Sequence, residues 1–113
     1  MAENARSPEM EHLVSVLEIA PLLGWSRMDS PQGDGRGEIR LTNDGYVLKI
    51  ELWDYKIHRG SLHRPGFDKH RNAGVGEYTY DKVEIIWRWL DEPRRRRWME
   101  WKEAARLAKA AGL

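Results

Sequence analysis

The fold is decided by residues 37–53, GEIRLTNDGYVLKIELW. Apolar and polar residues alternate on either side of Asn43-Asp44-Gly45, and this period of two is typical of strands with one buried face. Asn, Asp and Gly tolerate the positive φ angles that a tight hairpin turn requires. The stretch therefore predicts an antiparallel hairpin whose apolar face packs on a helix and whose other face meets solvent.

An amphipathic helix is expected before this hairpin. Ser7 can cap its N-terminus, and Pro8 suits its first turn. Apolar residues at helical spacing form its buried stripe: Met10, Leu13, Val14 and Leu17. Between helix and hairpin, residues 29–37 (DSPQGDGRG) offer almost nothing to pack, so they predict a flexible connection.

The pattern is less regular after the hairpin. Four glycines and a proline predict a long irregular loop over residues 58–76, and residues 77–80 resemble a short strand. Residues 83–89 fit either a helix or a strand, and a last helix is expected to begin at Pro93. Together these features predict an α+β fold of one domain, residues 1–113: an N-terminal amphipathic helix, a small antiparallel sheet of three or four strands and two C-terminal helices.

Composition narrows the class of protein. The chain has 113 residues, of which 41% are hydrophobic and 33% charged, which is typical of one globular domain. It has no cysteine, which excludes disulfides, thiol catalysis and cysteine-based zinc sites. No apolar run is long enough for a membrane span, and the first residues do not resemble a secretory signal. We therefore expect a cytoplasmic protein without membrane contacts or a cofactor.

The charges are unevenly distributed along the chain. Residues 1–57 hold six Lys/Arg and ten Asp/Glu, a net of −4, whereas residues 58–113 hold thirteen and eight, a net of +5. Such asymmetry suggests an anionic partner for the basic half. The alternative is that the acidic half packs beside the basic half within one fold.

Two groups of cations are candidates for binding phosphate. The first lies in and before the irregular loop and comprises Lys56, Arg59, Arg64, Lys69 and Arg71. The second, Arg94 and Arg95, begins a run of four arginines at the expected helix start. They predict a small nucleic-acid-binding accessory protein that favours RNA or another single strand. Local pairing of the arginine run with Asp91, Glu92 and Glu100 is the alternative.

The histidines permit a second hypothesis. His63 and His70 could act as general acid and base in a toxin-like ribonuclease that needs no metal. A metal site built from His58, His63, Asp68 and His70 has suitable ligand types, but their spacing matches no zinc signature. No metal is therefore predicted.

Six tryptophans suggest a third hypothesis. Helical spacing places Trp87, Trp98 and Trp101 on buried stripes, whereas Trp53 and Trp89 fall on faces assigned to solvent. An exposed tryptophan can anchor a protein interface. The chain could therefore be a protein-interaction module, such as an inhibitor or an antitoxin, that binds its partner through Trp53 or Trp89.

Overall fold

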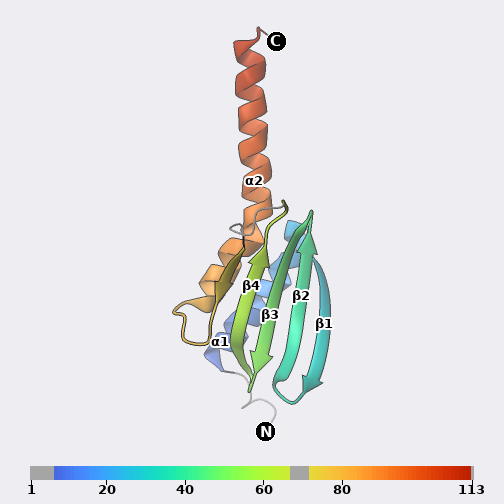
Figure 1. Cartoon of the computed structure of the whole chain (residues 1–113), viewed down its shortest axis with the longest axis vertical. Coiled ribbons are helices and arrows are strands. Elements are labelled where there is room, and N and C mark those ends of the chain that lie inside the picture. Colours follow the sequence, from blue (N-terminus) through green and yellow to red (C-terminus); the bar gives the residue numbers. More distant parts are fainter. Residues whose placement is uncertain (1–6, 67–71, 113) are drawn as a thin grey trace.

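The computed structural model describes residues 7–66 and 72–112, and it has an antiparallel sheet backed by helices (Figure 1). The elements, in chain order, are α1 (Pro8–Ile19), the 3-10 helix η2 (Ala20–Leu23), β1 (Ser26–Gly33), β2 (Arg36–Asn43), β3 (Tyr46–Trp53), β4 (Lys56–His63), β5 (Ala73–Val75) and α2 (Lys82–Ala110). Strand order in the sheet follows chain order, so the sheet is a meander. The α+β class is confirmed, but the sheet has five strands rather than three or four.

The hairpin expected from residues 37–53 is confirmed as β2 and β3. Its turn residues, Asp44 and Gly45, have φ angles of 49° and 86°, as a twist-matched two-residue turn requires. The side chains that alternate inward are buried: Ile39, Leu41, Leu48 and Ile50. These residues form the centre of the core.

The first helix also begins as expected. The Ser7 side chain accepts a hydrogen bond from the Met10 amide at 3.2 Å, which caps the N-terminus. Leu13 and Leu17 are buried against the sheet, and the regular helix ends at Ile19, two residues before Pro21.

The flexible connection expected over residues 29–37 is wrong. Most of this segment belongs to β1 and β2, which pair with each other as a hairpin. The turn between them, Asp34-Gly35, is itself a strong hairpin signal. All eight residues of β1, which is an edge strand of the sheet, are exposed. Its backbone ladder to β2 holds it, so its side chains carry no apolar alternation.

The long loop expected over residues 58–76 is also largely wrong. Residues 56–63 form β4 and residues 73–75 form β5. Ile57 and Leu62 are buried, and Gly60 occupies an inward position between them. Residues 77–80 form turns rather than a strand.

One helix, α2, replaces the two C-terminal helices that were expected. Residues 83–89 are helical, and the helix continues through Pro93 to Ala110. A proline removes only one backbone donor from a helix, and Pro93 is fully buried at this point. Arg94 and Arg95 therefore lie in the middle of a helix, and not at its start.

Both helices cover the same face of the sheet, while the opposite face is open (Figure 1). Val83, Ile86 and Leu90 of α2 are buried in the core with α1 and the inward strand residues. Pro93 is the last buried residue described in α2. The C-terminal part of the helix extends far past the end of the sheet (Figure 1). The molecule is consequently elongated, 65 Å by 27 Å by 25 Å.

Gly60 allows the helix layer to approach β4 closely, and this gives a test of the packing. A methyl group at Gly60 would lie 3.2 Å from Val75 Cγ2 and 3.6 Å from the Trp89 ring. We expect Gly60→Ala to lower the free energy of unfolding by roughly 1–3 kcal/mol in denaturant melts. Gly76→Ala is the matched control, because nothing lies within 4 Å of its new methyl, and it should change stability by less than about 0.5 kcal/mol. Equal stability of both variants would contradict this packing.

Candidate functional site

The cations expected to bind nucleic acid are dispersed. Lys56 begins β4, and Arg64 directly follows its last residue. A strand rises by about 3.3 Å per residue, so these two positions are more than about 20 Å apart. Lys69 and Arg71 lie outside the described residues. The described cations therefore do not form the continuous basic loop that the sequence indicated.

Several of these cations already have a carboxylate partner. Arg59 Nε lies 3.1 Å from Glu51, and Arg94 Nε lies 2.7 Å from Asp91. Arg64 donates two hydrogen bonds to the Glu92 carboxylate, through Nε and one terminal nitrogen. This bidentate hydrogen bonding is the main reason that the pKa of Arg64 lies above its usual value. Such pairing lowers the charge available to a phosphate.

The histidine hypotheses gain no geometric support. His63 is exposed at the end of β4, whereas His70 lies outside the described residues, so an acid–base pair of the two remains a prediction. Asp68 of the considered metal site also lies outside them. Within residues 7–66 and 72–112, no three His, Asp or Glu side chains are grouped closely enough to hold a metal ion.

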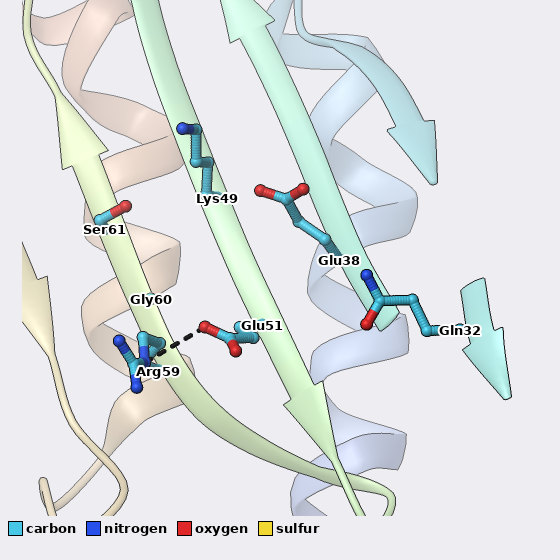
Figure 2. A pocket seen from close by; sticks show the side chains of 7 residues that line it. All are labelled: Gln32, Glu38, Lys49, Glu51, Arg59, Gly60 and Ser61. Carbon is cyan, nitrogen blue, oxygen red and sulfur yellow. Dashed lines mark ion pairs between the residues drawn. The ribbon is translucent and has the colours of Figure 1, made fainter. Parts of the chain in front are cut away.

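The open face of the sheet carries a hollow of about 360 Å³ (Figure 2). It is lined by Gln32, Glu38, Lys49, Glu51, Arg59, Gly60 and Ser61. Its two carboxylates balance its two cations, and an ion pair joins Arg59 of β4 to Glu51 of β3 (Figure 2). This balance is typical of a solvated sheet face, and it offers no excess charge to a charged ligand.

Three of the five assigned tryptophans are placed opposite to expectation, whereas Trp53 is exposed and Trp87 is partly buried against the core, as expected. Trp89, expected on the surface, is only 7% exposed and fills the space above Gly60. Trp53 is 50% exposed, but the Arg36 guanidinium lies 3.7 Å from its ring centroid and covers part of it. Trp98 and Trp101, expected in the core, are 57% and 61% exposed. Their helical spacing does place them on one face of the helix, but no part of the core within the described chain packs against that face.

These two tryptophans lie on the projecting half of α2, residues 94–110 (Figure 1). Their rings stack on each other, with centroids 5.2 Å apart and an angle of 24° between the planes. All described side chains in this half are exposed except that of Ala108, which is partly covered. A stacked pair of large aromatic rings in solvent is a typical anchor for a partner.

An apolar stripe continues from the tryptophan pair toward the tip of the helix. It consists of Trp98, Trp101, Ala104, Ala105 and Ala108. Trp98, Trp101, Ala105 and Ala108 are spaced alternately three and four residues apart, which is the a and d spacing of a coiled coil. From Trp98 onward, this face of the helix holds no charged residue.

The charges of the projecting half are sorted around the helix. Arg96 pairs with Glu100 at 3.1 Å, and Arg106 pairs with Glu103 at 2.6 Å, on the side away from the stripe. Four other cations make no ion pair or hydrogen bond through their side chains within the described part of the chain. These flanking cations, Arg95, Arg97, Lys102 and Lys109, occupy the e and g positions beside the stripe.

The base of the projecting half is fixed to the body of the protein. The Trp25 indole N–H donates to the Leu90 carbonyl at 2.8 Å, and the Arg64–Glu92 pair joins the end of β4 to α2. Just past Pro93, Arg96 lies over the Tyr46 ring, and a hydrogen bond with Tyr46 is the main cause that raises the pKa of Arg96. The helix is therefore held at its exit from the core.

Comparison of the chain with protein-family models, curated proteins and solved structures found no match. None of the helices in the described ranges is both long and apolar enough to cross a membrane. Geometry and charge are therefore the guides to function.

The different surroundings of the tryptophans give a direct test. We expect the double change Trp98→Ala and Trp101→Ala to alter the free energy of unfolding by less than about 0.5 kcal/mol, because it removes only the exposed contact of the two rings with each other and no core packing. Trp89→Ala should cost about 3–5 kcal/mol, because it leaves a cavity between helix and sheet. Denaturant melts of both variants measure this. Destabilisation of the double variant comparable to that of Trp89→Ala would place Trp98 and Trp101 in a core.

Proposed function

We propose that this protein is a protein-interaction module whose docking element is the projecting half of α2. One observation carries the proposal: the stacked Trp98–Trp101 pair begins an uncharged stripe on a helix that no described residue covers. The module class agrees with one of the hypotheses from the sequence. The docking residues, however, are these two tryptophans rather than Trp53 or Trp89.

The shape of the stripe favours a helical partner. Coiled-coil spacing presents one narrow seam along the helix, which a second helix can follow over its whole length. Alanines at positions 104, 105 and 108 allow a close approach of another backbone, while the two tryptophans supply most of the apolar area. A membrane surface is the weaker candidate, because beyond the two tryptophans the stripe offers only alanines. Helices that bind to membrane surfaces carry larger apolar side chains along their length.

The fixed base adds to this proposal. A docking helix that is already formed and oriented loses less conformational entropy when a partner binds. The contacts of Trp25 with Leu90 and of Arg64 with Glu92 hold the helix at its exit from the core. The partner thus meets a preformed helix instead of a disordered tail.

Nucleic acid is the second candidate partner. The observation in its favour is that Arg95, Arg97, Lys102 and Lys109 lack acidic partners in the described chain and lie near two aromatic rings that could stack on bases. Binding of this kind would weaken steeply with salt. It would not use the alanines of the stripe, which is why the helical partner is favoured.

Two synthetic peptides of three heptads test the proposal. Both carry Leu at a and d, one with Glu and the other with Lys at e and g, so that neither pairs with itself. We expect at least one of them to bind the full-length protein and to shift the tryptophan fluorescence toward the blue. The double change Trp98→Ala and Trp101→Ala should weaken this binding at least about tenfold, measured by calorimetry because the fluorescent pair is absent.

Two controls define failure. Peptides of the same composition with scrambled order should not bind, and a single-stranded RNA at the same low salt measures the second candidate. If neither ordered peptide binds, or if the scrambled peptides bind equally well, the helix-docking function is wrong. Tryptophan-dependent binding of RNA alone would replace it with the nucleic-acid function.

A further inference from the structure

We infer that the partner of the projecting half of α2 is an amphipathic helix with acidic residues beside its apolar seam. This inference rests on the proposed function and names the chemistry of its partner. The observation behind it is the sorting of cations around the helix: the four that flank the stripe are unpaired within the described chain, whereas Arg96 and Arg106, away from the stripe, are paired. Arg94, which precedes the stripe on the same face, is paired with Asp91.

The position of each unpaired cation supports an acidic partner. With Trp98 and Ala105 at a, and Trp101 and Ala108 at d, the e positions are Arg95, Lys102 and Lys109. Arg97 stands at a g position. Residues at e and g meet the facing helix of a coiled coil and select it by charge. Four cations without an acid at these positions therefore call for Glu or Asp on the other helix.

A second copy of this chain is a poor partner for the same reason. In a parallel pair, g residues face e residues of the other helix, so Arg97 would face Lys102. In an antiparallel pair, e residues face e residues, so lysines would face lysines. Either arrangement brings like charges together beside the seam and disfavours self-association.

The two acids of the projecting half agree with this assignment. Glu100 and Glu103 lie away from the stripe, where Arg96 and Arg106 hold them, and the hydrogen bond with Arg106 lowers the pKa of Glu103. Acids on the far side keep the seam and its flanks purely apolar and basic. The docking surface thus presents one sign of charge to its partner.

The experiment compares the acidic and basic three-heptad peptides on the intact protein. We expect the acidic peptide to bind at least about tenfold more tightly than the basic one at low salt, with the difference shrinking as salt rises. The double change Lys102→Gln and Lys109→Gln should weaken the acidic peptide several-fold. The matched control is Arg88→Gln with Arg106→Gln, which removes the same net charge from residues paired with Glu84 and Glu103, and it should change binding by less than about twofold.

Each other result overturns the inference. Equal binding of both peptides, or tighter binding of the basic one, leaves helix docking intact but rejects the acidic partner. Equal weakening by the two double variants shows that net charge, and not the flanking positions, attracts the peptide. Concentration-dependent dimerisation of the protein alone, by sedimentation at micromolar concentration, makes a second copy the partner. Absence of binding by either peptide rejects the proposed function itself.

Discussion

Helix α2 is longer than the sheet it packs on, and this mismatch shapes the molecule. Its 29 residues run for roughly 43 Å at about 1.5 Å per residue, whereas strands of eight residues span roughly 26 Å. Among the described residues, the buried side chains of α2 end at Pro93, and beyond it only Ala108 is partly covered. Whatever lies beyond Pro93 must be held as a helix by its own chemistry and must find its packing partner elsewhere.

The projecting half has the means to remain helical. It extends a helix that is already packed, so it adds residues without the cost of a new nucleus. Alanine, arginine, lysine and glutamate are strong helix formers, and the pairs Arg96–Glu100 and Arg106–Glu103 join side chains one helical turn apart. These local terms favour continuation of the helix beyond Pro93. They do not explain why two large apolar side chains, Trp98 and Trp101, are exposed to solvent on this helix.

Sequence patterns predicted the elements whose side chains alternate between core and solvent. The hairpin around Asp44-Gly45 and the helix capped by Ser7 follow local rules that need no tertiary information. Strand β1 was not predicted, because an edge strand is held by backbone hydrogen bonds and its side chains need not alternate. The Asp34-Gly35 turn signal before β2 was nevertheless present. Helical spacing placed Trp98 and Trp101 on an apolar stripe, but periodicity cannot reveal whether the partner of that stripe lies in the same chain. Whether the stripe packs within the chain depends on the length of α2 and on the fact that Trp89, rather than Trp98 or Trp101, is buried in the core.

Native-state hydrogen exchange along α2 tests most directly whether the projecting half is a preformed docking helix without an internal partner. In the free protein, amides of residues 86–92 should exchange at the rate of global unfolding, because they lie on the packed part of the helix. Amides of residues 99–109 should exchange orders of magnitude faster, yet more slowly than in an unfolded peptide, and they should gain protection when the acidic peptide is added. Equal protection of both segments in the free monomer would contradict the account, since it would show that the second half of α2 is already packed within the chain.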